Sequence, residues 1–277
     1  METVSRFLNE DPDPEQPLSL VLGGKLEEAN AELHKLYSTA IASRIGPRTE
    51  TFRLIAGAIV AVSTYRPLCD GTLASLIGLE SRIVSSWVDD LSSLLYRDAS
   101  QKGGIRVRHL SVLEFLVGPT CPAEFRVDLG QANAELGVRC LGTMLKELSF
   151  NMCELETSYS PNAEIRDSED RVERKISDAL HYSCMYWSNH LCSDLKHVNT
   201  KVSELLDTFF KNALPLYWLE VLSLLGKVRA GILALRDIKD PAKVLAYSSL
   251  IIIMADGSRR NSKSVISVWL TIFCASC

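Results

Sequence analysis

Histidine and cysteine are concentrated in one short stretch of the chain. His181, Cys184, His190, Cys192 and His197 lie within seventeen residues, a composition that is typical of zinc sites. The neighbouring apolar residues predict a helix over 172–191, however, and His181 and Cys192 are eleven residues apart, about 16 Å along a helix axis. Ligands of one zinc ion lie about 2 Å from it. We therefore expect no metal site and interpret Cys184 as a core residue, with the histidines at helix edges.

Nucleophilic catalysis would need a serine or cysteine beside a histidine, with a carboxylate to orient the imidazole. The chain contains these residue types, but it has no Gly-x-Ser-x-Gly turn and no cysteine-protease signature. We therefore expect that the protein is not an enzyme and has no catalytic residues.

A phosphate-binding loop needs spaced glycines followed by Lys and then by Ser or Thr, whose hydroxyl binds magnesium. The nearest candidate is Leu-Gly-Gly-Lys at 22–25. It lacks the upstream glycine, and Leu26 and Glu27 stand where the hydroxyl should be. We expect no autonomous nucleotide binding and no bound cofactor.

The overall composition is that of a folded protein without a strong charge. The 277 residues are 47% hydrophobic and 23% charged, with a net charge of -4. These values exclude a wholly disordered chain, and they give no basic surface of the kind that dominates nucleic-acid binding. We therefore expect no nucleic-acid partner.

The N-terminal part of the chain reads as a leader, one helix and a small mixed module. Residues 1–16 are rich in acidic residues and proline and predict a disordered leader. A helical pattern with spacings of three and four then begins at Leu18 and ends at Gly46 and Pro47. Over 47–128 we predict helices at 52–62, 73–77 and 80–95, a strand at 105–108, a helix at 110–116 and a strand at 125–128. That order is typical of a winged helix, with three helices and a short β-wing.

From residue 129 onward the pattern is almost continuously helical. The longest apolar stripe runs through Val172, Ile176, Leu180, Cys184, Trp187 and Leu191, at spacings of three and four. Such a stripe is one face of a helix. Further helices are predicted around 136–148, 202–210 and 216–225. The fold class is therefore mainly α, a winged-helix module followed by a helical array.

Neither end of the chain predicts export or a membrane span. The first twenty residues contain no apolar stretch of signal-peptide length, which favours a reduced, cytoplasmic location for the eight cysteines. The longest apolar runs, 244–255 and 265–277, are shorter than the ~20 residues that a membrane helix needs. We expect no membrane partner, although the apolar C-terminal run leaves a location at a membrane interface open.

Several motifs occur in the order found in one protein family. They are Leu-His-Lys-Leu-Tyr at 33–37, the stretches 52–67 and 73–79, Val-Arg-His-Leu-Ser-Val-Leu-Glu-Phe-Leu at 107–116, Cys-Pro-Ala-Glu-Phe-Arg-Val-Asp at 121–128, and segments at 140–144, 151–155, 180–191 and 216–226. Together they resemble the region that follows the NACHT ATPase core in fungal STAND proteins, the NOD-like receptors of fungi.

The resemblance implies a domain order and one site residue. Residues 17–46 would be the end of a NACHT module, 47–128 a winged-helix domain and 129–235 a helical connector. The family is a switch, closed with ADP and open with ATP. The histidine of its His-x-Ser-Phe-x-Asp motif, implied to contact the ADP phosphate, is His109 here. A histidine packed at a strand end is the alternative.

The chain departs from the family in ways that shape the functional prediction. The motif Phe and Asp are replaced by Val112 and Glu114. The ATPase core expected before Pro17 and the sensor repeats expected after the connector are not recognisable, and 236–277 reads as an atypical, truncated tail. We therefore predict a non-catalytic regulatory or interaction protein whose partner is a NACHT-bearing ATPase, coupled to nucleotide only through that partner.

Two alternatives remain open from the residues. A winged-helix DNA-binding regulator would use the third helix, 80–90, which carries one arginine against three acidic residues. DNA phosphates would repel that helix, although Arg97, Lys102, Arg106 and Arg108 offer a basic edge. An inactive remnant is the other alternative.

Overall fold

The computed structural model describes residues 25–156, 167–192 and 200–237. Within these ranges the protein is mainly helical, with one two-stranded sheet, as the sequence predicts. The leader at 1–16 and nearly all of the tail at 236–277 lie outside the described residues. No described helix is long and apolar enough to span a membrane.

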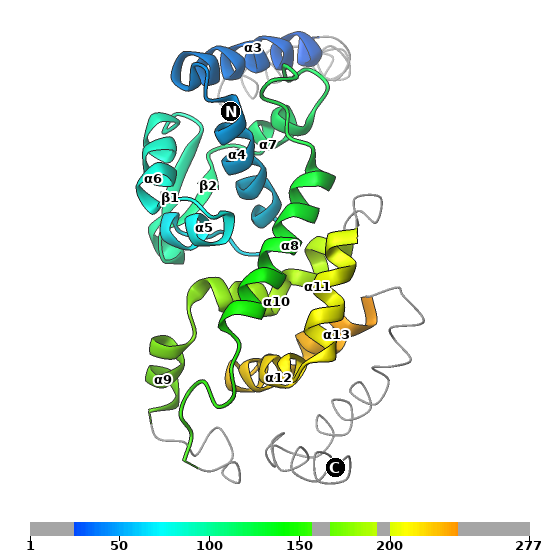
Figure 1. Cartoon of the computed structure of the whole chain (residues 1–277). Coiled ribbons are helices and arrows are strands. Elements are labelled where there is room, and N and C mark those ends of the chain that lie inside the picture. The colour runs from blue at the N-terminus through cyan, green and yellow to red at the C-terminus, as the bar shows by residue number, and fades with distance from the viewer. Residues whose placement is uncertain (1–24, 157–166, 193–199, 238–277) are drawn as a thin grey trace, which may run out of the picture.

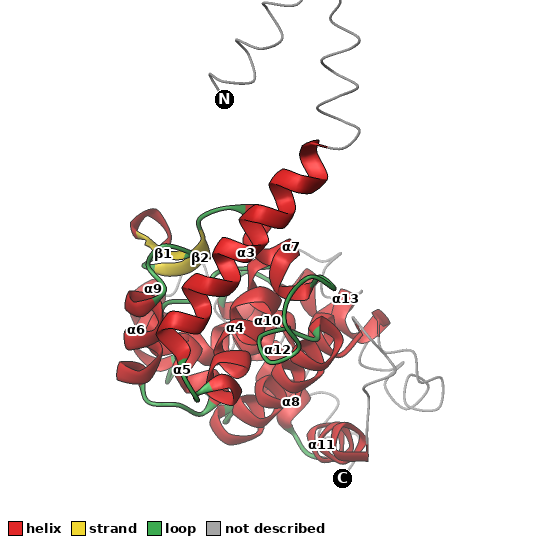
Figure 2. Ribbon diagram, turned by 90° about the horizontal axis from the view of Figure 1, so that it is seen from above, coloured by secondary structure: helices red, strands yellow, loops and turns green. Residues whose placement is uncertain are grey.

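The N-terminal module begins with four helices. They are α3 (Lys25–Ile45), α4 (Thr49–Ser63), α5 (Asp70–Ile77) and α6 (Ser81–Asp90). Helix α4 is the buried centre of the module, since nearly all side chains from Phe52 to Val62 are inaccessible. Helix α5 ends at Gly78, whose φ of 73° is the left-handed cap that glycine adopts without strain. Figure 2 shows α3 lying across the top of the molecule.

A hairpin follows α6, and it corrects the predicted order of elements. Strands β1 (Leu95–Asp98) and β2 (Gly104–Val107) pair antiparallel across the short turn η1 (Ala99–Gln101), and α7 (Leu110–Val117) comes next. The prediction extended the third helix to Leu95, but α6 ends at Asp90. Leu94 and Leu95 are buried at the start of the hairpin, so their apolar character reflects strand packing and not a helix face.

The predicted strand at 125–128 is wrong. Phe125 and Arg126 both donate their backbone N–H groups to the carbonyl of Pro122, and Val127 donates to Leu116. These bonds form a turn that runs back over α7. Phe125 and Val127 are buried while Arg126 is exposed, so the alternation that suggested a strand arises from a loop packed on one side.

Helix α8 (Leu129–Glu147) joins the module to the helical array (Figure 1). It contacts α4 and α5 in the module and packs along α10 in the array. The array consists of α9 (Ser168–Lys175), α10 (Asp178–Cys192), α11 (Thr200–Lys211), α12 (Leu214–Leu224) and α13 (Val228–Asp237). The close approach of α8 and α10 depends on Gly137, because a Cβ there would lie 2.6 Å from Leu191.

The single helix predicted over 172–191 is also wrong. Ile176 has an extended backbone, which ends α9. The hydroxyl of Ser177 then accepts the N–H of Leu180 at 3.0 Å and caps α10. Ile176, Leu180 and the later members of the stripe are nevertheless buried. The apolar spacing therefore continues across the boundary between two helices. Ser177, a residue type that favours helix N-caps, marks that boundary in the sequence.

The α8–α10 contact contains a buried polar network. Asn133 donates from Nδ2 to the carbonyl of Leu129 and accepts from Nδ1 of His190 at 2.8 Å through Oδ1. Nε2 of His190 then accepts the hydroxyl of Tyr182, also at 2.8 Å. Burial lowers the pKa of His190 to about 4. The imidazole is therefore neutral at pH 7, with its proton on Nδ1.

Candidate functional site

His109 lies between β2 and α7 and begins α7. Its Nδ1 accepts the backbone N–H of Ser111 at 3.3 Å and lies 2.7 Å from the Ser111 hydroxyl. The ring thus replaces the usual Ser, Asp or Asn at a helix N-cap. Because the N–H of Ser111 can only donate, Nδ1 must be unprotonated and the proton lies on Nε2.

The opposite side of the His109 ring is available to a ligand. The residue is exposed, and no hydrogen bond joins its Nε2 to any of the described residues. A neutral imidazole in this tautomer presents one N–H donor outward. His109 is therefore oriented as a donor, which is the chemistry that a phosphate contact requires.

Helix α3 holds this cap from behind. The hydroxyl of Tyr37 lies 2.8 Å from that of Ser111, and the Tyr37 ring packs against Phe115 of α7. His34, one turn earlier on α3, also packs on Phe115 and bonds the hydroxyl of Thr120 at 2.9 Å. A movement of α3 would thus be transmitted to His109 through two hydrogen bonds, from Tyr37 to Ser111 and from Ser111 to His109.

The Ser111–His109 pair is a cap and not a catalytic dyad. Ser111 is 8% exposed, so its hydroxyl is poorly accessible to a substrate. Nδ1 of His109 is shared with the N–H of Ser111, and no described carboxylate orients Nε2. A triad needs both the accessible nucleophile and the orienting acid.

Buried thiols are equally unsuited to nucleophilic chemistry. Burial raises the pKa of Cys121 to about 11 and that of Cys140 to about 12, and it also raises the pKa of Cys184. A thiolate is the reactive form of cysteine. These thiols therefore stay protonated at neutral pH and pack as small apolar side chains.

The histidines and cysteines considered for zinc do not form a site in the described ranges. His190 is held by Tyr182 and Asn133, Cys184 is buried in the core, and His197 lies outside the described residues together with the side chain of Cys192. No group of three or more His, Cys, Asp or Glu side chains suited to a metal occurs among the residues that the structure describes.

The surface that would meet DNA in a winged-helix regulator carries paired charges. Three arginines near α6 and the hairpin have carboxylate partners: Arg82 with Glu80, Arg97 with Asp70 and Asp89, and Arg106 with Asp98. Arg108 instead donates to the carbonyl of Ser92. These pairings neutralise the basic edge that the sequence offered, which disfavours phosphate binding at this face.

One buried carboxyl shapes a loop rather than a site. Glu220 of α12 accepts the backbone N–H of Asn151 at 3.2 Å, and its Oε1 has no hydrogen-bond partner among the described residues. Burial raises the pKa of Glu220. Asn151 itself has φ of 51°, so the carboxyl helps to hold a left-handed backbone where α8 leads toward α9.

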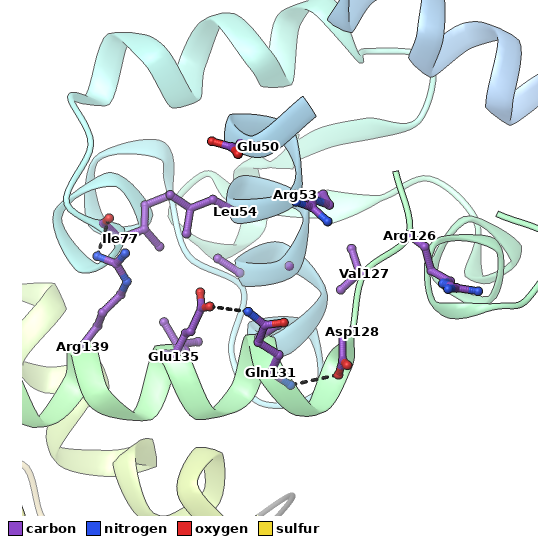
Figure 3. A pocket seen from close by; sticks show the side chains of 14 residues that line it. Glu50, Arg53, Leu54, Ile77, Arg126, Val127, Asp128, Gln131, Glu135 and Arg139 are labelled. Atoms are coloured by element: carbon purple, nitrogen blue, oxygen red, sulfur yellow. Dashed lines mark hydrogen bonds between the residues drawn. The ribbon is translucent and has the colours of Figure 1, made fainter. Parts of the chain in front are cut away.

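Figure 3 shows a cleft between α4 and α8, which no motif in the sequence predicts. It has a volume of about 340 Å³. Leu54, Ala58, Val127 and Leu136 contribute apolar surface, and three arginines and three carboxylates line it as well: Arg53, Arg126, Arg139, Glu50, Asp128 and Glu135. Arg53 and Arg126 are 73 positions apart, so no local spacing signals that they line the same cleft.

No protein-family model, curated protein or solved structure matches this chain. The likeness to STAND proteins therefore rests on the motifs at 33–226, and the functional argument rests on the geometry above.

Proposed function

We propose that the protein is a non-catalytic regulatory module of the STAND type, which docks on a NACHT-bearing ATPase and contacts its nucleotide through His109. The observation that supports this most directly is the orientation of the ring. Nδ1 is fixed by the cap of α7, so Nε2–H faces outward. A histidine that reaches a phosphate from a neighbouring domain stabilises one arrangement of the two domains and not the other.

The arrangement of α3, α7 and the hairpin supports the same proposal. Tyr37 and Ser111 connect α3 to the His109 cap, so a partner that engages α3 would affect the sensing residue directly. Leu36 on α3 and Leu110 beside His109 are 65% and 64% exposed. Large exposed apolar side chains beside a donor are suited to a protein interface.

The test is isothermal titration with ADP and with ATP, each with magnesium, on the chain alone and with an intact NACHT domain supplied in trans. We expect no nucleotide binding by the chain alone and ADP-dependent association of the two proteins. His109→Asn keeps a good N-cap, but its shorter side chain places no N–H donor at the position of Nε2. It should therefore weaken this association about tenfold, the usual value of a hydrogen bond to a charged group.

His109→Ala removes both the cap and the donor and should weaken association at least as much. Unchanged ADP dependence in His109→Asn would reject the role of His109. Absence of association in every nucleotide state would contradict the docking proposal and favour an inactive remnant, and tight binding to random duplex DNA at about 50 mM salt would favour the DNA-binding alternative.

A further inference from the structure

The α4–α8 cleft lies apart from the His109 site, since no residue of α3 or α7 lines it. Where the two helices cross, Gly57 faces Ala132. A Cβ at Gly57 would lie 3.2 Å from that of Ala132. Small residues therefore let the two helices meet, and the larger side chains on either side leave an open cleft of about 340 Å³. This volume is within the range of ligand sites.

The charges that line the cleft differ in how they are used. Asp128 accepts the N–H of Gln131 at the start of α8, and Glu135 accepts the side-chain amide of Gln131. At the other end, Arg139 donates to the carbonyl of Ile77 at 2.6 Å. These groups line the α8 side of the cleft (Figure 3).

The side chains of Arg53 and Arg126, in contrast, make no hydrogen bond or ion pair within the described ranges. Both are exposed, and neither has a carboxylate or carbonyl partner among the residues that the structure describes. They come from α4 and from the loop before α8, and Val127 lies between them in Figure 3. Glu50 is one turn from Arg53 on α4, but the two side chains extend to opposite sides of that helix in this view.

We propose that this cleft binds an acidic segment of a protein partner, with a carboxylate at Arg53 and Arg126 and an apolar side chain against Leu54, beneath which Ala58 and Leu136 are buried. Arginine forms bidentate bonds with carboxylates and is enriched at protein interfaces. Glu50, Asp128 and Glu135 would repel a nucleic-acid backbone, whereas a peptide with one or two acids places its charge only where the free arginines are.

The test is selection of a random peptide library on the immobilised full-length chain, followed by affinity measurement of the selected peptides. We expect enrichment of Asp or Glu next to an apolar residue. Replacement of the acids by Asn or Gln should weaken binding at least tenfold, and the double variant Arg53→Gln/Arg126→Gln should do the same. Arg229→Gln, an exposed arginine on α13, is the matched control and should bind like the original chain.

Methyl NMR of the full chain locates the peptides. Peptides bound as proposed should shift the resonances of Leu54, Ala58 and Leu136 and leave Leu110, beside His109, unchanged. No selected peptide, no acidic enrichment, or equal binding by the double variant would each overturn the proposal. The outcome is independent of the His109 role, because neither experiment contains an ATPase or a nucleotide.

Discussion

The N-terminal module and the helical array stabilise their contacts with different polar groups. In the module, Arg97 of β1 joins α5 and α6 through ion pairs with Asp70 at 2.7 Å and Asp89 at 2.6 Å, on a surface that water reaches. In the array, His190 joins Tyr182 and Asn133 with no access to water. The first interaction is charged and partly exposed, and the second is neutral and buried.

This difference has physical consequences. Exposed ion pairs contribute little to the free energy of folding, because water and salt screen the two charges. Buried neutral hydrogen bonds also add little net energy when complete, but a buried group that loses its partner is costly. The buried network of the array should therefore respond strongly to substitution and to acid. The ion pairs of the module should respond weakly to substitution and visibly to salt.

The largest effect is expected for the aromatic core of the array. Trp218 is fully buried, packs on Trp187 and Phe209, and donates to the carbonyl of Cys184 at 2.9 Å. Trp218→Ala should lower the free energy of unfolding by about 3–5 kcal/mol, measured by urea unfolding with far-UV circular dichroism. Phe150→Ala, at a ring that is 73% exposed, is the control and should cost much less. Equal losses would contradict the assignment of the core.

Acid should act on the array through His190. Its pKa is near 4 in the folded protein and 6.5 when unfolded, so the unfolded state binds more protons between these values. The contribution of His190 to the free energy of unfolding is therefore fully present above pH 6.5. It is lost as the pH falls from 6.5 through 4, by up to about 3 kcal/mol in total.

His190→Gln removes this titration, so the difference between the two pH profiles isolates the contribution of His190 from all other groups. We expect the profiles to converge toward low pH. Parallel profiles in urea unfolding from about pH 7 to pH 4 would show that His190 is not the buried neutral group described here.

Two glycines on α8 should give opposite effects. A Cβ at Gly137 would lie 2.6 Å from Leu191 of α10, whereas nothing lies within 4 Å of one at Gly142. Gly137→Ala should therefore cost about 1–2 kcal/mol through overpacking, less its gain in helix propensity, and Gly142→Ala should gain up to about 1 kcal/mol. Thermal unfolding, monitored by circular dichroism, shows whether each variant is more or less stable than the original chain. Stabilisation by both would mean that the α8–α10 contact is looser than described.

The smallest effect is expected for the ion pairs of the module. Arg97→Gln should cost about 1 kcal/mol or less at low ionic strength, and the loss should shrink toward zero at about 1 M salt. Arg82→Gln is the control, because the Arg82 side chain is 81% exposed and its ion pair is with Glu80, which is 63% exposed at the same helix end. A large loss that salt does not reduce would remove the distinction between the two regions.

Most helices could be predicted from the sequence because each carries its own signals. The apolar face of α4, the glycine after α5 and the capping serine of α10 are local features. The strand wrongly predicted at Phe125 and the break missed at Ile176 show the limit of this approach. Alternating or periodic apolar residues indicate which side chains are buried, but not in which secondary structure. A packed loop can bury the residues expected of a strand, and two short helices can bury those expected of one long helix.

Of the two candidate sites, one could be predicted from the sequence and the other could not. The His109 motif is contiguous, so the sequence marks it, but the free direction of Nε2 depends on hydrogen bonds with Ser111. The α4–α8 cleft has no local signal, since Arg53 and Arg126 line it together only after α4 and the loop before α8 have packed against each other.

The amino-acid sequence by itself determined that the chain is mainly helical, that a small mixed module precedes a helical array, and that the net charge is small. Helical periodicity and capping are local, so they can be recognised without knowledge of the partners. Only the tertiary structure decided that His190 is neutral and that Gly137 must remain small. It also decided that the arginines near α6 are paired, while Arg53 and Arg126 have no carboxylate partner among the described residues. Each of these properties depends on distances between residues that are far apart in the chain, which periodicity does not encode.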